Sequence, residues 1–410
     1  MRPDICDNGS WPGRRGADAF GCREPHRWQN WSAPPTSFPH WLQKGIYSYI
    51  RYSTLPSSRK TQKGHAGGRA KIGAMKRMLV RAGLLLAFAT VLSAAKNLEI
   101  YFIDVEGGQS TLFVAPGGDT LLMDTGYGGF NGRDSGRILA AAKAAGVKKI
   151  DYLVISHYHA DHVGGIPGVA AKLPIQNFVD HGPNTEADKD SQVRFNMYRD
   201  FAGKANRITV KPGDTIPVKG LDVRVLAGAG NTIAAPLAGA GQPNPECAQY
   251  RPDPAEETNE NQQSLGLLIS YGDFRILDLG DLTASHEHDL ACPANKIGTV
   301  AVLVASHHMG AVANTPQLIH AVHPKVAVAN NGPRKGGTPE AWQTLHDTQG
   351  LEDIWQLHYA IAAGKDHNSA DTFLANVDEI CQGKWLRLTA EKDGSFTVFN
   401  SRNKFEKSYR

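Results

Sequence analysis

Short apolar runs separated by glycine-rich turns dominate the chain from residue 98 onward. Runs of about four to eight residues, bounded by Gly, Pro, Asn or Asp, are typical of buried strands. They occur at 98–105, 109–115, 120–123, 152–155, 177–181, 221–226, 264–270, 274–279, 300–305, 326–329, 385–390 and 397–400. Helical spacing marks 135–145, 193–201, 315–321 and 338–346. Two strand-rich halves with interleaved helices predict an α/β domain in which two sheets pack together under covering helices.

The first 95 residues differ from the rest in their pattern. Residues 1–74 show no clear periodicity, which indicates a disordered extension or a start assigned upstream of the true one, at Met75 or Met78. Residues 75–95 have a basic beginning, an apolar core interrupted by Arg81, and small residues at the end. That order is typical of a secretory signal peptide, with a buried helix or an uncleaved anchor as the alternative. The sequence therefore predicts one domain at 96–410 in a periplasmic or secreted protein, with no stable membrane span in the mature chain.

Charge is distributed unevenly between these two parts. The whole chain has 44 Lys or Arg and 40 Asp or Glu, and its first 95 residues hold 15 of the basic and 4 of the acidic ones. Residues 96–410 therefore hold 29 basic and 36 acidic residues, a net charge of −7. Non-specific nucleic-acid binding relies on basic surfaces, so this balance does not favour a nucleic-acid partner.

Three cysteines remain after residue 95, namely Cys247, Cys292 and Cys381. None has CxxC spacing, so the pattern does not indicate a thiolate zinc site. One disulfide is compatible with an oxidising compartment, and the sequence does not determine which pair forms it.

The segment from Ser156 to Gly165 carries the strongest chemical signal. It places three histidines and one aspartate within six residues, directly after an apolar run. These are ligand types that divalent zinc prefers. His157 and His159 share one face because extended residues repeat every two positions, and Asp161 and His162 follow on the turn toward a second position. The segment predicts a metal centre, whereas a histidine-rich surface loop is the simpler alternative.

Three other apolar runs are also followed by aspartate or histidine, which are residue types that can bind or support a metal ion. Asp281 follows 274–279, and a carboxylate there can bridge two cations. His307 ends the run at 300–305 and is expected to complete the second position, with His308 as the alternative because strand register is uncertain by one residue. Asp124 ends the run at 120–123 and is expected to orient a ligand rather than bind metal.

The HxHxDH run at 157–162 resembles the signature of the metallo-β-lactamase superfamily, and the resemblance covers roughly 98 to 387. It implies an αββα sandwich of two mixed sheets flanked by helices, a one- or two-metal centre, and hydrolytic chemistry. In this superfamily the aspartate of a Gly-Asp motif such as that at Asp281 commonly bridges the metals, and an aspartate like Asp124 supports the ligands.

One expected histidine is missing before the Gly-Asp run, where residues 258–265 contain none. His181, also at a strand end, is a candidate replacement ligand, a substrate contact, or an ordinary loop residue. The Asn-rich segment, the Gly-Asp motif and the later His-His-Met-Gly are similar to the hydrolase domain of ComEC competence proteins, apart from Met309 and from Thr338-Pro339, where that family usually has His-Pro. This resemblance implies a stand-alone, exported relative acting on phosphodiesters.

His358 and His367 are further candidates for a metal or substrate contact, because both follow a short apolar run. We therefore predict a metal-dependent hydrolase with two zinc ions, manganese being the alternative ion. Asp161 is expected to orient or deprotonate the nucleophile. The expected substrate is a phosphodiester or another small molecule, with an ester, lactone or β-lactam as the alternative. A non-catalytic metal-binding protein of the same fold is the rival from another functional class.

Overall fold

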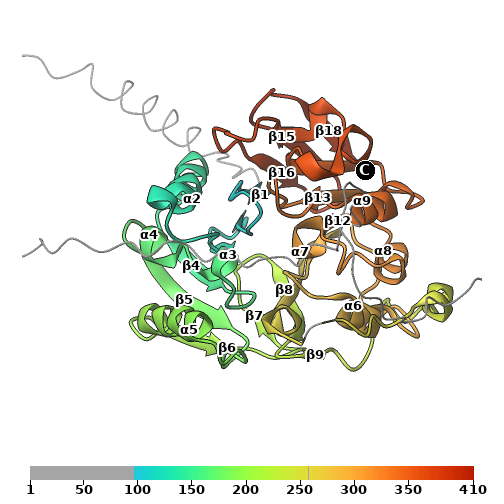
Figure 1. Ribbon diagram of the computed structural model, residues 1–410, viewed down its shortest axis with the longest axis horizontal. Helices are drawn as coiled ribbons and strands as arrows, with labels where there is room; N and C mark the ends of the chain where they lie inside the picture. Colours follow the sequence, from blue (N-terminus) through green and yellow to red (C-terminus); the bar gives the residue numbers. More distant parts are fainter. Residues whose placement is uncertain (1–96, 257) are drawn as a thin grey trace, which may run out of the picture. The chain divides into compact units, whose positions relative to one another are not determined.

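The computed structural model describes residues 97–410 except residue 257. The predicted signal segment and the extension before it lie outside the described residues, so both remain predictions. In the described part, the strands form two nine-stranded sheets (Figure 1). The first sheet has the order β18-β17-β16-β1-β2-β3-β4-β5-β6, and the second has the order β15-β14-β13-β12-β11-β10-β8-β7, with β9 paired to β8.

The bounds of the strands are as follows. The first sheet contains β1 (Leu98–Phe102), β2 (Thr111–Val114), β3 (Thr120–Met123), β4 (Ile150–Val154), β5 (Ile175–Asp180), β6 (Asn206–Thr209), β16 (Leu386–Ala390), β17 (Phe396–Asn400) and β18 (Glu406–Tyr409). The second contains β7 (Thr215–Ile216), β8 (Asp222–Gly228), β9 (Asn231–Thr232), β10 (Gly266–Tyr271), β11 (Phe274–Asp278), β12 (Val302–Val304), β13 (Val326–Ala329), β14 (Asp353–His358) and β15 (Leu374–Asn376).

The helices lie between these strands in the sequence. The α-helices are α2 (Arg133–Ala144), α3 (Ala160–Val163), α4 (Ile166–Ala170), α5 (Lys189–Ala202), α6 (Ala284–Ala291), α7 (Ser306–Met309), α8 (Pro316–Val322) and α9 (Pro339–His346). The 3₁₀ turns are η1 (Phe130–Gly132), η2 (Pro245–Gln249), η3 (Glu260–Gln263), η4 (Ile361–Ala363), η5 (Lys365–His367) and η6 (Asp371–Phe373). Among the described residues, no helix has the length and apolar character needed to cross a membrane.

Apolar residues cover both faces of the strands because each sheet is covered on both sides. In β1, Ile100 and Phe102 belong to the core between the two sheets. Tyr101 and the following Ile103 belong instead to the core under the helices, since successive strand residues point to opposite faces. Helices α2 to α5 contribute to that outer core of the first sheet, and α6, α8 and α9 cover the second sheet (Figure 1). The predicted α/β sandwich of two mixed sheets flanked by helices is therefore confirmed.

Parallel strand pairs bring the predicted chemistry to one edge. Strands β3, β4 and β5 run parallel in the first sheet, as do β11, β12 and β13 in the second. The carboxyl ends of parallel strands share an edge, so the segments that follow them lie close together.

A single disulfide joins the long loop after β9 to the end of α6. Cys247 pairs with Cys292, with 45 residues of sequence separation and 5.7 Å between the Cα atoms. Cys381 is free and half-buried. The structure thus chooses one of the three pairings that the sequence left open.

Candidate metal centre

Four buried side chains form a compact group of metal-ligand types at the shared edge. The group consists of Asp161, His162, Asp281 and His308, and one ligand atom from each lies within 4.8 Å of all the others. His162 Nε2 lies 3.3 Å from Asp161 Oδ2 and 3.2 Å from Asp281 Oδ2. His308 Nε2 lies 3.1 Å and 3.2 Å from the same two oxygens. Two imidazoles and two carboxylates therefore converge on one small volume, which suits a divalent cation.

Each member of this group follows the end of a strand. Asp161 and His162 lie in the short helix α3 that comes after β4, Asp281 follows β11, and His308 follows β12. His307, His308 and Met309 all have positive φ values, of 52°, 57° and 61°. Residues other than glycine rarely adopt this left-handed conformation, and such conformations concentrate at functional sites.

The left-handed turn after β12 decides which of two adjacent histidines points inward. His308 has a fully buried side chain and joins the group of four. His307 keeps a side chain that is 21% exposed, and its Nε2 lies 3.5 Å from Asp281 Oδ2 alone. The sequence pattern favours His307 as the inner residue with His308 as the alternative, and in the structure His308 is the inner one. No periodic pattern reveals a turn of this kind, so the register was uncertain by one residue.

A second pair of histidines lies beside the group of four. His157 Nε2 and His159 Nδ1 are 2.9 Å apart, and His157 Nε2 is 3.9 Å from Asp281 Oδ2. Asp281 therefore lies between the buried group and this histidine pair. The structure thus brings together all the residues of the HxHxDH run with Asp281, His307 and His308.

Asp124 lies behind His162 rather than inside the group. Its Oδ2 is 2.7 Å from His162 Nδ1, and its carboxylate also accepts hydrogen bonds from the backbone N–H and the hydroxyl of Ser156. The partner of Nδ1 assigns one proton to that nitrogen, so Nε2 is the ring atom that faces the group. A carboxylate behind a ligand histidine fixes both the tautomer and the ring orientation.

Unpartnered buried atoms test whether a cation fits this group. His162 Nε2, both ring nitrogens of His308, and Asp281 Oδ1 are buried and lack a hydrogen-bond partner among the described residues. A buried polar atom without a partner costs about 1–3 kcal/mol. Two of these atoms, His162 Nε2 and His308 Nε2, face the converging carboxylates, so a bound divalent cation would give them the partner they lack. The residues present therefore fit a metal ion.

Lys335 also belongs to this region, although the sequence pattern does not predict it. It lies in the loop after β13, and its Nζ contacts Asp161 Oδ2 while its side chain stays 39% exposed. Its Nζ also lies 5.8 Å from the centre of the Tyr127 ring. The only sequence signal was a lone lysine in a Gly- and Pro-rich loop after a strand, which does not by itself point to a metal centre. The contact nevertheless places a partly exposed positive charge beside the buried group.

The electrostatics of the group keep its carboxylates ionised. Burial alone would raise the pKa of Asp161, but the Lys335 ammonium and the His162 imidazole hold it well below its usual range. Burial also opposes ionisation of Asp281, and its neighbouring histidines hold its pKa well below the usual value. Burial would lower the pKa of His162, yet three nearby carboxylates raise it well above the usual value. A cation must therefore displace a proton from His162 when it binds.

His157 differs from His162 in its protonation. Burial lowers the pKa of His157 well below its usual value, and the neighbouring His162 and His159 lower it further. Its Nδ1 faces the hydroxyls of Ser156 at 3.0 Å and Ser264 at 3.4 Å. His157 is thus neutral near pH 7, the protonation state that binds metal, and its Nε2 faces His159 Nδ1 at 2.9 Å.

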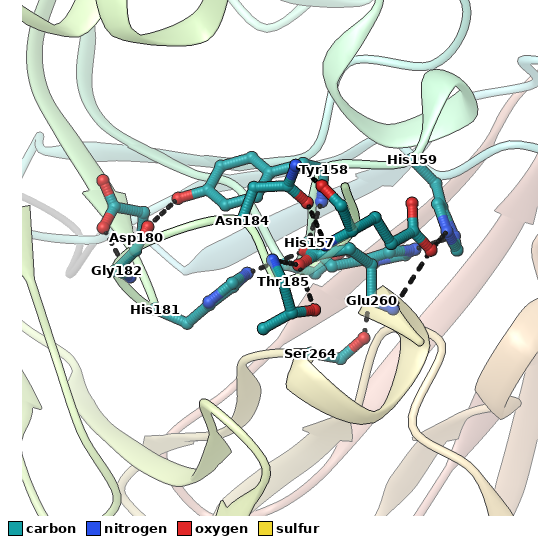
Figure 2. Close-up of polar contacts among 12 residues, drawn as sticks. His157, Tyr158, His159, Asp180, His181, Gly182, Asn184, Thr185, Glu260 and Ser264 are labelled. Atoms are coloured by element: carbon teal, nitrogen blue, oxygen red, sulfur yellow. Dashed lines mark hydrogen bonds and ion pairs between the residues drawn. The ribbon is translucent and has the colours of Figure 1, made fainter. Parts of the chain in front are cut away.

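The remaining candidate histidines have partners elsewhere. Figure 2 shows His181 beside Glu260, with 3.1 Å between Nε2 and Oε2. His358 Nε2 lies 2.9 Å from Asp104 Oδ1, and the His367 ring packs against Trp342. Among the contacts of the described residues, none joins these three histidines to the buried group. Glu260 lies in the segment 258–265 that lacks the expected histidine, and the sequence pattern does not predict its contact with His181.

A second cluster of residue types that can bind metal is already contacted by an arginine side chain. Asp104, His358 and Cys381 offer ligand atoms within 4.8 Å of one another. Arg137 donates to Asp104 at 2.8 Å and lies 3.2 Å from Cys381 Sγ. Unlike the group of four, this cluster contributes no unpartnered buried side-chain atom among the described residues, so it is a satisfied hydrogen-bond network.

Comparisons with known proteins agree with this geometry. Residues 104–235 match the family model described as Metallo-beta-lactamase superfamily. A hydroxyacylglutathione hydrolase from Rhodopseudomonas palustris (strain HaA2) is 34% identical over 97 residues, which are 23% of this chain and 31% of that protein. The chain therefore matches about a third of the length of this curated relative.

Two solved structures are among those to which the chain is similar. The metallo-β-lactamase fold protein YhfI from Bacillus subtilis matches with a TM-score of 0.39 and 11% identity, over 63% of this chain and 96% of that chain. MEM-A1, a subclass B3 metallo-β-lactamase from a soil metagenome library, matches with a TM-score of 0.33 and 13% identity, over 52% of this chain and 77% of that chain. The family match thus makes residues 104–235 similar to the metallo-β-lactamase superfamily.

Proposed function

We propose that this chain is a metal-dependent hydrolase and that its preferred substrates are phosphodiesters. The observation that carries the proposal is the buried group of Asp161, His162, Asp281 and His308 with its unpartnered atoms. A divalent cation held there supplies a Lewis acid and lowers the pKa of a coordinated water toward about 7. Zinc is the proposed ion because imidazole and carboxylate suit it, with manganese as the alternative.

The chain's own residues divide the remaining work. Asp161 has a pKa held well below its usual range, so it accepts protons poorly and acts as a ligand rather than as a general base. We therefore propose a ligand role for Asp161 in place of the deprotonating role expected from the sequence. Asp124 fixes the His162 tautomer through the 2.7 Å contact with its Nδ1.

Lys335 supports an anionic substrate. Its ammonium group is partly exposed beside the buried group, where it can bind the negative charge of a phosphodiester. This local charge matters because residues 96–410 carry a net charge of −7, which would otherwise repel an anion. The similarity to ComEC-type hydrolase domains in the His-His and Gly-Asp motifs favours the same substrate class.

The match to a hydroxyacylglutathione hydrolase supports a second candidate, a thioester substrate. A substrate panel separates the two candidates. Full-chain protein loaded with zinc is assayed with bis(p-nitrophenyl) phosphate, p-nitrophenyl acetate, a hydroxyacylglutathione and a chromogenic β-lactam. We expect the phosphodiester to be turned over fastest and a chelator to abolish that turnover. Preferred turnover of the thioester would overturn the substrate proposal, and metal binding without any turnover would favour the non-catalytic rival.

Export to an oxidising compartment is part of this proposal. The disulfide between Cys247 and Cys292 supports it, because such bonds persist mainly outside the reducing cytosol. The segment at 75–95 that resembles a signal peptide lies outside the described residues. Amino-terminal sequencing of the protein from its native cell should begin at or within a residue or two of Lys96, whereas an uncleaved chain would contradict export.

A further inference from the structure

The two halves of the candidate centre are unequal in their ligands. The buried group supplies two imidazoles and two carboxylates. The neighbouring pair supplies only His157 and His159, with Asp281 3.9 Å away from His157 Nε2. His181 does not complete this second position, because Glu260 holds its ring at 3.1 Å (Figure 2). A metal at the histidine pair therefore depends strongly on how well those two rings are oriented.

Glu186 contacts the outer ring of this pair. Its Oε1 lies 3.0 Å from His159 Nε2. Both side chains are partly exposed, His159 by 25% and Glu186 by 21%, so solvent competes with their contact and the carboxylate needs its own support. That support comes from Ser191, whose hydroxyl donates to Glu186 Oε2 at 2.7 Å.

The backbone at Glu186 is also fixed. Its N–H donates to Asn184 Oδ1 at 3.1 Å, and its carbonyl accepts from the side chains of Asn184 at 2.8 Å and Gln192 at 2.6 Å. Ser191 and Gln192 belong to α5, which begins after its N-cap residue Asp188. The first turns of α5 therefore hold the Glu186 carboxylate against His159.

The contact determines which nitrogen of His159 faces the centre. An anionic carboxylate at Nε2 assigns the proton to that nitrogen, so Nδ1 has the free lone pair. Nδ1 is the atom that lies 2.9 Å from His157 Nε2. The arrangement parallels the contact of Asp124 with His162 in the buried group. Each half of the centre thus has one carboxylate that orients one histidine.

We propose that Glu186 is the positioning residue of a second, weaker metal position formed by His157, His159 and Asp281. This inference rests on the proposed metal centre. The buried group binds the first ion, and Glu186 determines whether the second position fills at moderate metal concentrations. Loss of a carboxylate behind a ligand histidine lowers metal affinity about 10- to 100-fold.

The test is a stepwise titration of the metal-free full-chain protein with Zn²⁺ in competition with a chromophoric chelator. Wild type should bind two ions in separate steps. Glu186→Ala should weaken the second step about 10- to 100-fold and leave the first unchanged. Ser191→Ala, which removes the support of the carboxylate, should weaken the same step by a smaller factor. Asp124→Asn should weaken the first step instead.

Glu340→Gln is the matched control, because Glu340 is exposed in the first turn of α9. It should alter neither step, and the unfolding midpoint of every metal-free variant should show that the fold is intact. Equal weakening of both steps by Glu186→Ala, or no weakening, would overturn the proposal. A wild type that binds only one ion would overturn it while leaving a one-metal hydrolase intact. Absence of any zinc binding would instead refute the proposed function.

Discussion

Replacing His308 and His307 separately by alanine should have very different effects on metal binding. His308 Nε2 lies 3.1 Å and 3.2 Å from the two carboxylates of the buried group, and its side chain is fully buried. His307 reaches one carboxylate at 3.5 Å from a side chain that is 21% exposed. His308→Ala therefore removes one of four converging ligands, whereas His307→Ala leaves all four in place.

The size of the effect follows from the number of ligands. Structural sites with four ligands bind zinc with a free energy of about 10–16 kcal/mol. If the four ligands contribute equally, each one accounts for about 2.5–4 kcal/mol of it. Since 1.4 kcal/mol corresponds to a factor of ten, His308→Ala should lower the affinity for the first zinc ion about 100- to 1,000-fold. His307→Ala should lower it less than about tenfold, because a partly exposed ion-pair contact such as that of His307 with Asp281 contributes at most about 1 kcal/mol.

The assay measures zinc affinity by chelator competition and the unfolding midpoint with and without zinc. A ligand that binds only the folded state raises that midpoint, so the zinc-induced shift should survive in His307→Ala and shrink in His308→Ala. Both metal-free variants should unfold with midpoints close to that of metal-free wild type. An equal loss in the two variants, or a larger loss in His307→Ala, would refute the assignment of His308 to the buried group.

Three further predictions concern charge, protonation and the disulfide. Lys335→Met should lower kcat/KM for bis(p-nitrophenyl) phosphate about 10- to 100-fold, because a hydrogen bond to a charged group contributes about 1.5–3 kcal/mol. It should change kcat/KM for neutral p-nitrophenyl acetate little. An equal loss for both substrates would contradict the role of Lys335 in binding an anionic substrate. Burial raises the pKa of Asp278 to about 7, so the folded protein retains a proton that the unfolded chain releases from about pH 4, and stability falls as the pH rises toward 7. Asp278→Asn removes this dependence. In urea unfolding with chelator present, the free energy of unfolding of Asp278→Asn minus that of wild type should therefore increase by about 3 kcal/mol between pH 5 and 8. A difference that stays constant over this range would refute the raised pKa of Asp278. Replacing both Cys247 and Cys292 by serine should lower the free energy of unfolding by about 4 kcal/mol, which is the loop-entropy value for a separation of 45 residues. Zinc affinity should stay the same. An unchanged free energy of unfolding would contradict the contribution of the disulfide.

The fold was predictable because both faces of its strands are buried. Apolar runs such as 98–105 and 274–279 mark strands covered on both sides, and the turns between them contain Gly, Pro, Asn or Asp. Boundaries were less certain. The helix expected at 193–201 begins earlier, at Lys189, because Asp188 caps it by accepting hydrogen bonds from two backbone N–H groups.

The neighbours of the centre were less predictable than its inner residues. The HxHxDH run and Asp281 stand next to strand ends, so their convergence follows from the topology. Lys335 contacts Asp161 across 174 residues, and His181 pairs with Glu260 across 79. Such contacts depend on loop paths that no local pattern encodes.

Dependence of hydrolysis on bound metal tests the central claim most directly. Chelator-treated full-chain protein is titrated with Zn²⁺ while bis(p-nitrophenyl) phosphate turnover and bound zinc are measured in the same samples. Turnover should be absent without metal and should rise in step with bound zinc. It should remain absent in Asp281→Ala, which lacks the carboxylate between the two halves of the centre. Turnover that persists without metal, or that is equal in Asp281→Ala and wild type, would contradict the account.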